Sequence, residues 1–241
     1  MGKMVPTIID GGNASANLSV YDTNSITPVA HKLYLLCMAW CGTDALTPPD
    51  PTSIVGCNLT WTKVDGEAYK TTGANRFAYG VWRAQGSAPT AGPITVTFPS
   101  LRAGWVWFVL EVDSTKMTGS DGADAIGQVT KNSTVDIDEG GTITTTTLAA
   151  PVNVLSSIPL VVLAVNNDIG IGGMNFPADW LQIGERDHAA PTELLTVAYN
   201  PAWTNSATAT AAMGTNNNFA GIMAIELVNN IEKPGNFFFR S

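Results

Sequence analysis

The feature of this sequence that most constrains its fold is a succession of short apolar runs, separated by clusters of Gly, Pro, Asn and Asp. The runs have the length of β-strands and are rich in β-branched and aromatic residues, which favour strands. No segment of about ten residues or more shows a clean helical period. This pattern predicts an all-β fold of the sandwich or jelly-roll type. The clearest runs cover residues 33–40, 76–84, 94–98, 105–112, 158–165, 194–199, 206–213 and 219–228.

The order of these segments occurs twice along the chain. Trp61 in the first half corresponds to Trp180, 119 positions later (180 − 61), and Glu111 corresponds to Glu226, 115 positions later (226 − 111). Two copies are too few for a solenoid, which needs at least about three stacked units. We therefore expect a single large antiparallel β-sandwich made of two repeat-related halves that complete each other's core.

The expected boundaries follow from this repeat. Residues 15–118 form the first half of the sandwich and residues 142–230 form the second, with about six strands in each. Residues 119–141, which are rich in Asp, Glu and Gly, form the linker. Residues 1–14 and 231–241 lie outside the repeat as extended N-terminal and C-terminal arms.

The charge of the chain restricts its partners. Charged residues make up 13% of the 241 residues, about half the usual share, and the net charge is −8. An acidic surface without a basic patch repels phosphate, so we expect no nucleic-acid and no membrane binding. No apolar stretch approaches the roughly 18 residues of a membrane span. The N-terminus also lacks the pattern of a signal peptide, so we expect synthesis and folding in a cytosol.

Several motifs of strands and tryptophans carry a family resemblance. In the first half they are residues 59–64 (LTWTKV), 81–84 (VWRA), 94–98 (ITVTF) and 105–111; in the second half they are residues 176–180 (FPADW) and 219–226. This series resembles a β-sandwich domain found in phage structural proteins and in some bacterial surface proteins. The resemblance covers roughly residues 15–230. Residues 53–58 depart from it, because the family has a Pro-Gly turn before the tryptophan.

The resemblance implies a non-enzymatic structural protein of a phage particle. The expected role is that of a capsid decoration (cement) protein, made in the host cytoplasm and located in the virion. Its expected partners are the major capsid protein or other virion subunits, and it is expected to form a homo-oligomer. The alternatives are a tail or fibre component, a carbohydrate-binding or receptor-binding module, and, in a third class, an enzyme on a jelly-roll scaffold.

The tryptophans have two possible roles. Their rings can stack on sugars, or they can fill the space between two sheets. Trp82, Trp105 and Trp107 lie within predicted strands, so we expect them in the core. Trp203 lies in a loop rich in Pro and Asn and is the best candidate for an exposed interaction residue.

No pattern in the sequence predicts a catalytic site. Glu111 and Glu226 could form the carboxylate pair of a glycosidase, which requires a separation of roughly 5–10 Å. Since they occupy equivalent positions in the two halves, the repeat alone explains why a glutamate occurs at both. His188 follows two acidic residues, but no G-x-S-x-G nucleophile motif accompanies it. Residues 170–173 (GIGG) precede no helix, so a phosphate loop is not indicated.

Cysteines and acidic clusters predict neither a metal nor a cofactor. Cys37, Cys41 and Cys57 are too few for a disulfide framework, and we expect buried free thiols. A closed zinc site would need more ligands than these thiols and two histidines offer. Calcium ligation by residues 121–124 or 136–139 lacks the spacing of an EF-hand, so solvated acidic loops are expected.

The C-terminal segment contains three consecutive aromatic residues, Phe237, Phe238 and Phe239. Leaving three such rings in water is costly. They either fold back on their own sandwich or dock on a neighbouring subunit. The sequence leaves both interpretations open, and these residues join Trp203 as candidate interaction residues.

Overall fold

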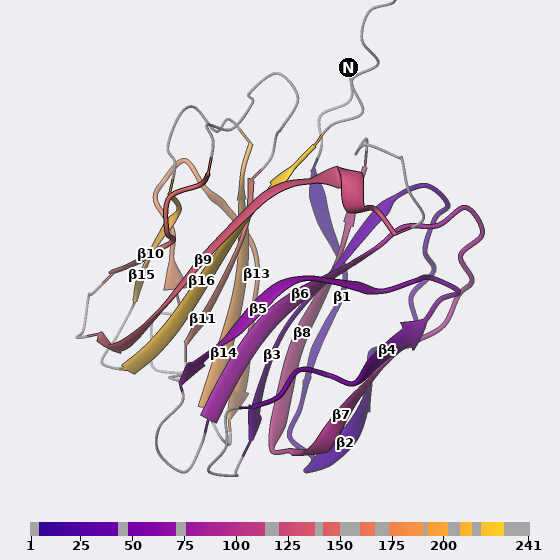
Figure 1. Ribbon diagram of the computed structural model, residues 1–241, viewed down its shortest axis with the longest axis horizontal. Coiled ribbons are helices and arrows are strands. Elements are labelled where there is room, and N and C mark those ends of the chain that lie inside the picture. Colours follow the sequence, from indigo (N-terminus) through magenta and orange to yellow (C-terminus); the bar gives the residue numbers. More distant parts are fainter. Residues whose placement is uncertain are drawn as a thin grey trace, which may run out of the picture.

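The computed structural model consists almost entirely of antiparallel strands (Figure 1). The helical element of the described chain is a three-residue 3₁₀ turn, η1 (Ala123–Ala125), and no described helix could cross a bilayer. The prediction of an all-β antiparallel sandwich is therefore confirmed. The structure describes residues 5–42, 48–70, 76–113, 121–137, 142–149, 160–166, 174–189, 192–201, 208–213 and 218–228.

The strands of the first half form two sheets. They are β1 (Pro6–Ala14), β2 (Leu18–Asp22), β3 (Leu33–Gly42), β4 (Ser53–Gly56), β5 (Thr62–Lys70), β6 (Arg76–Ala84), β7 (Ile94–Arg102) and β8 (Gly104–Val112). Inner sheet 1 has the strand order β1-β8-β3-β6-β5, and outer sheet 1 has the order β2-β7-β4.

The strands of the second half are arranged in the same way. They are β9 (Ile126–Ile137), β10 (Thr142–Thr144), β11 (Leu160–Asn166), β12 (Met174–Asn175), β13 (Leu181–Ala189), β14 (Thr192–Asn200), β15 (Thr210–Met213) and β16 (Asn218–Leu227). Inner sheet 2 has the order β9-β16-β11-β14-β13, and outer sheet 2 has the order β10-β15-β12. Adding eight to each strand number of the first half gives the strand order of the second.

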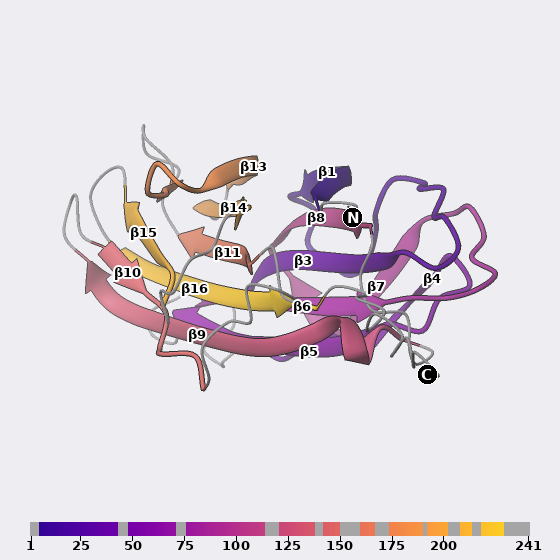
Figure 2. The ribbon, with the colours of Figure 1, turned by 90° about the horizontal axis from the view of Figure 1, so that it is seen from above.

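The four sheets stack as layers, in the order outer sheet 1, inner sheet 1, inner sheet 2 and outer sheet 2 (Figure 2). A central core lies between the two inner sheets and contains side chains of both, such as Phe108 and Met223. Outer core 1, which contains Trp105, lies between the two sheets of the first half. Outer core 2, which contains Ala198, lies between the two sheets of the second half. The halves therefore share one core, and each has another of its own.

Strand β3 shows how its sequence produces this layering. All ten of its residues are buried. Cys37 and Ala39 point into the central core, whereas Met38 and Trp40 point into outer core 1. Because successive side chains of a strand point to opposite faces, a strand covered on both sides needs a continuous apolar run. The run at residues 33–40 meets that need.

The N-terminal segment is part of the sandwich. Residues 6–14, expected to lie outside it as an arm, form the edge strand β1 and pair with β8. A Cβ atom on Gly11 or Gly12 would come within 2.5 Å of the rings of Phe108 and Trp107 respectively. Glycine is therefore needed where an apolar residue would usually stand, since a ring approaches the backbone closely. The sequence consequently lacks the usual alternation here.

The segment expected to be a linker, residues 119–141, also contains a strand. Ile126–Ile137 form β9, the edge strand of inner sheet 2, and pair with β16. Strand β9 occupies the position in the second half that β1 occupies in the first. In the described chain each half therefore contributes eight strands rather than six.

Candidate functional site

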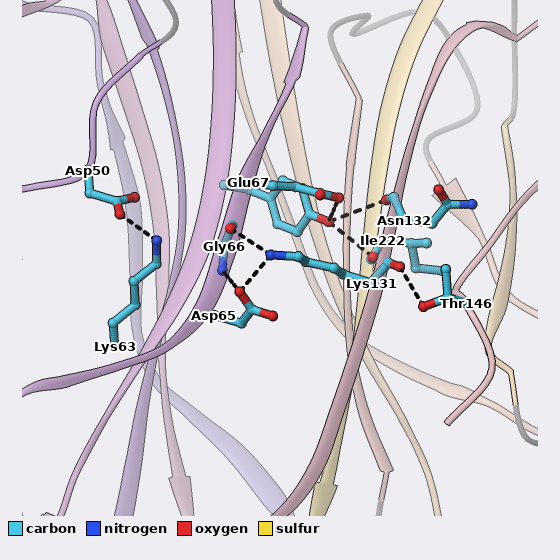
Figure 3. Close-up of polar contacts among 10 residues, drawn as sticks. Asp50, Lys63, Asp65, Gly66, Glu67, Lys131, Asn132, Thr146 and Ile222 are labelled. Atoms are coloured by element: carbon cyan, nitrogen blue, oxygen red, sulfur yellow. Dashed lines mark hydrogen bonds and ion pairs between the residues drawn. The ribbon is translucent and has the colours of Figure 1, made fainter. Parts of the chain in front are cut away.

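One group of polar residues joins the two halves along β5 and β9 (Figure 3). The Nζ atom of Lys131 on β9 donates to Oδ1 of Asp65 at 2.6 Å and to the carbonyl oxygen of Gly66 at 2.9 Å. A β-bulge between Lys63 and Asp65 shifts the register of β5 here, and bulges commonly redirect a side chain. The ion pair is partly exposed, so it contributes at most about 1 kcal/mol. Its role is to hold two edge strands of different sheets together.

The hydroxyl group of Tyr79 on β6 forms a second link between the halves. It lies 3.1 Å from the carbonyl oxygen of Ile222, 3.3 Å from that of Asn132 and 3.0 Å from Oε1 of Glu67 (Figure 3). Burial raises the pKa of this phenol well above its usual range, so it remains a hydrogen-bond donor. Ile222 and Asn132 belong to the second half, so this phenol bridges the central core.

A second polar group lies at one end of the central core. Oε1 of the fully buried Glu193 on β14 accepts a hydrogen bond from Tyr69 on β5 at 3.0 Å. His188 lies directly opposite Glu193 on β13, and a Cβ atom on Gly104 would come within 2.4 Å of its ring. Burial raises the pKa of Glu193 well above its usual range, because the carboxylate would lose its hydration. Burial, and secondarily the charge of Glu193, raises the pKa of the Cys41 thiol.

Burial limits the catalytic roles that this group of residues could have. Cys41, His188 and Glu193 are residue types that serve as nucleophile, base and acid in enzymes. Their exposed fractions are 0%, 2% and 0%, so a substrate cannot reach them in this conformation. A raised thiol pKa also leaves little reactive thiolate. The arrangement therefore acts as a contact between the halves.

Glu111 and Glu226 are not brought together. Glu111 accepts hydrogen bonds from Tyr34 at 2.8 Å and from Lys32 at 2.5 Å, on the side of inner sheet 1 that faces outer core 1. Glu226 accepts one from Gln128 at 2.7 Å and follows the alternation of β16 that faces outer core 2. The central core separates these two faces, so the two carboxyl groups cannot flank one glycosidic bond.

Five of the six described tryptophans are buried in the two outer cores. Trp82, Trp105 and Trp107 are buried in outer core 1, as predicted, and the last two stack at a centroid distance of 4.1 Å. Trp180 is buried in outer core 2. Trp61 is partly exposed, and its Nε1 atom donates to the carbonyl oxygen of Gly56. The candidate interaction residues Trp203, Phe237, Phe238 and Phe239 lie outside the described residues.

Thiols and acidic residues form no metal site in the described part of the chain. The three cysteines are free and buried, as predicted, and burial raises the pKa of Cys37 to about 12. Asp121 accepts hydrogen bonds from Arg83 and from the backbone N–H of Ala123, so this acidic residue serves the local structure. Asp138 and Glu139 of the second acidic cluster lie outside the described residues.

The sequence interpretation missed an apolar surface on outer sheet 1. Val20 on β2 and Val55 on β4 are exposed, although the neighbouring Tyr21 and Ile54 pack in outer core 1. The sequence pattern that could have revealed this surface is a pair of adjacent apolar residues in a short strand, in a sheet that is covered on one face only. One member of such a pair must point away from the core.

No protein-family model, no curated protein and no solved structure matches this chain.

Proposed function

We propose that this chain is a non-enzymatic structural protein of a phage particle, acting as a decoration protein that stabilises the capsid by contacts with neighbouring subunits. The observation that carries the proposal is a contrast between interior and surface. The reactive residue types Cys41, His188 and Glu193 are sealed in the central core, whereas large apolar side chains are exposed on outer sheet 1. The resemblance of the strand and tryptophan motifs to those of a sandwich domain of phage structural proteins supports the same role.

A decoration protein needs a rigid fold rather than a catalytic site. The Lys131–Asp65 ion pair and the Tyr79 hydroxyl group tie the two halves together across their edges and through their shared core. A protein that binds only the assembled shell shifts the equilibrium toward that shell by mass action. Many copies on a lattice also multiply a weak contact through avidity.

The proposal is tested by the composition of purified phage particles. Quantitative mass spectrometry of particles from the phage that encodes this chain should find it at a fixed ratio to the major capsid protein. Separation of heads from tails distinguishes a decoration protein from a tail or fibre component. Absence from the particles would show that the proposal is wrong.

A loss-of-function experiment complements this measurement. Particles assembled without the chain should release their genome at lower temperature than complete particles, and adding the purified protein should restore the difference. Equal heat stability of the two kinds of particle would contradict a stabilising role.

A further inference from the structure

The buried polar group around Glu193 lies at one rim of the central core. Glu193 is the second residue of β14, and His188 lies opposite it, one residue from the end of β13. In the first half, Tyr69 and Cys41 each lie one residue from the end of β5 and β3 respectively, and Gly104 begins β8. Strands of both inner sheets therefore end at this rim, where the halves can separate locally while the middle of the core stays packed.

The carboxyl group of Glu193 has few partners for a group that is fully buried. Its Oε1 atom accepts a hydrogen bond from the Tyr69 hydroxyl group at 3.0 Å. Its Oε2 atom has no hydrogen-bond partner among the described residues. A buried carboxylate needs several donors or a cation to replace its hydration. The site therefore accommodates the protonated carboxyl group much better than the charged one.

The acids that surround Glu193 do not stabilise a charge on it. Burial, and after it the charge of Glu193, raises the pKa of Tyr69 on β5 and of Cys41 on β3. Tyr79 on β6 packs against the ring of Tyr69 at a centroid distance of 6.0 Å. Ionisation of any of these groups would add a further negative charge to the core. Their neutral forms leave the Tyr69 hydroxyl group as the donor to the carboxyl group.

Two basic side chains lie near this rim. Arg102 on β7 is buried and acts on the Cys41 thiol, but its guanidinium group lies over the ring of Phe98, a member of outer core 1. Arg102 thus packs in the layer beyond inner sheet 1. His188 on β13 is the neighbour that faces Glu193 across the strand pair. Because histidines commonly change charge near neutral pH, the role of His188 must be separated from that of Glu193 by experiment.

The fold does not require a carboxyl group at this place. The equivalent position in the first half, the second residue of β6, is Phe77, which packs in the central core. Leu195 and Val197 follow Glu193 on the same face of β14 and belong to the same core. Replacing a buried charged residue by a well-packed apolar one is often neutral or stabilising. Glu193 is therefore a titratable group at a contact that packing alone would fill with an apolar side chain, which is the arrangement that a pH switch needs.

We propose that Glu193 is a proton-operated latch between the two halves. With the carboxyl group protonated, its contact with Tyr69 holds the rim closed. Loss of the proton to solvent leaves a charge in the core, and the carboxylate regains its hydration when β13 and β14 move away from β3 and β5. This movement exposes the Cys41 thiol. The latch is a property of the fold and does not depend on the proposed function.

The pH range of the latch follows from the pKa of Glu193 in the two forms. In the open form the hydrated carboxyl group has the ordinary pKa of a glutamate, about 4.3. In the closed form burial raises its pKa well above that value. The closed form is therefore favoured fully below the ordinary pKa, and this preference is lost as the pH rises towards the raised value. Between the two values the ratio of open to closed molecules rises by up to about tenfold per pH unit.

Labelling of the thiols measures the opening at this rim. The full-length protein is treated with N-ethylmaleimide between about pH 5 and pH 8, and tandem mass spectrometry assigns the label to each cysteine. The reagent is kept in the range where the rate is proportional to its concentration, so that the rate reports the open fraction. Ionisation of an open thiol alone makes labelling about tenfold faster per pH unit. Cys41 should show a further rise of up to about tenfold per unit, whereas Cys37, nearer the middle of β3, should not.

Two variants identify the group that titrates. Glu193→Gln keeps an acceptor for the Tyr69 hydroxyl group but cannot ionise, so the labelling of Cys41 should keep only the rise that its own thiol causes. His188→Gln removes the other titratable neighbour and should leave the further rise in place. Glu185→Gln, at an exposed position of the same half, is the matched control for the exchange of a carboxyl group for an amide.

Three results would overturn the proposed latch. Equal pH dependence of Cys41 labelling in the unmodified protein and in Glu193→Gln would show that Glu193 does not control the rim. Loss of the further rise in His188→Gln would assign the control to the histidine. The same further rise at Cys37 as at Cys41 would show that ionisation unfolds the chain as a whole. This last comparison needs only the unmodified protein, so it decides the question even if Glu193→Gln does not fold.

Discussion

The two outer cores occupy equivalent places in the two halves and are filled by different side chains. Outer core 1 contains four buried tryptophans, which are Trp40, Trp82, Trp105 and Trp107. Outer core 2 contains a single buried tryptophan among its described residues, and alanines are its commonest members, namely Ala198, Ala209, Ala211, Ala220 and Ala224. The contrast is sharpest at the seventh residue of β6 and of β14, which is Trp82 in one case and Ala198 in the other.

This difference teaches that one strand order accepts two ways of filling the space between sheets. Protein cores must reach a high packing density, and cores of different composition can do so when the total volume is conserved. Large rings fill a wide space, whereas small side chains require closer sheets. Strand order and core composition are therefore separate properties of this chain.

The largest effect is expected from separating the halves. Residues 1–125 expressed alone would expose the face of inner sheet 1 that forms the central core, including Leu35, Tyr79 and Phe108. We expect insoluble or unfolded protein, because this large apolar face loses its cover. The measurements are solubility and the dispersion of amide NMR signals. A soluble half with dispersed signals would show that the tryptophan-rich outer core 1 is sufficient by itself.

Exchanging side-chain size at the equivalent positions should have the next largest effect. Trp82→Ala removes a buried ring from outer core 1 and should lower the free energy of unfolding by about 3–5 kcal/mol. Ala198→Leu overfills outer core 2 and should lower it by about 1–3 kcal/mol. Urea denaturation of each variant gives these values.

Trp61→Ala is the control for this pair, because Trp61 is partly exposed. Its effect should be clearly smaller than that of Trp82→Ala. An unchanged free energy of unfolding for Ala198→Leu would contradict the prediction that a larger side chain overfills outer core 2.

A smaller effect is expected where the second half places a carboxyl group in the central core. The second residue of β6 is Phe77, and the second residue of β14 is Glu193. Because the folded protein raises the pKa of Glu193, its contribution to stability is complete below the ordinary pKa of a glutamate and is lost as the pH rises through the raised value. Stability should therefore fall with rising pH, and Glu193→Gln should reduce this fall.

The measurement is the urea midpoint of both proteins between about pH 5 and pH 8. The amide side chain introduced by Glu193→Gln retains an acceptor for the Tyr69 hydroxyl group, so the comparison isolates the ionisation of the carboxyl group. Glu185→Gln, at an exposed position of the same half, is the matched control for the exchange of a carboxyl group for an amide. Equal slopes for the unmodified protein and Glu193→Gln would show that Glu193 does not titrate in this range.

The sequence predicted much of the fold because burial leaves a pattern in it. The continuous apolar run of β3, the tryptophans of outer core 1 and the free thiols were all found in this way. Strands β1 and β9 were missed because they are edge strands with Gly or polar residues at many positions. The apolar surface of outer sheet 1 was missed because an apolar residue in a strand carries no mark of which face it occupies.

The sequence by itself determined that this chain forms short strands and which segments are buried on both sides. Tertiary structure decided what each buried face packs against. It separated the interior into three cores, brought Tyr69 of one half to Glu193 of the other, and left Val20 and Val55 exposed. The physical reason is that periodicity records whether a side chain avoids water, whereas its partner is set by contacts between strands far apart in the chain.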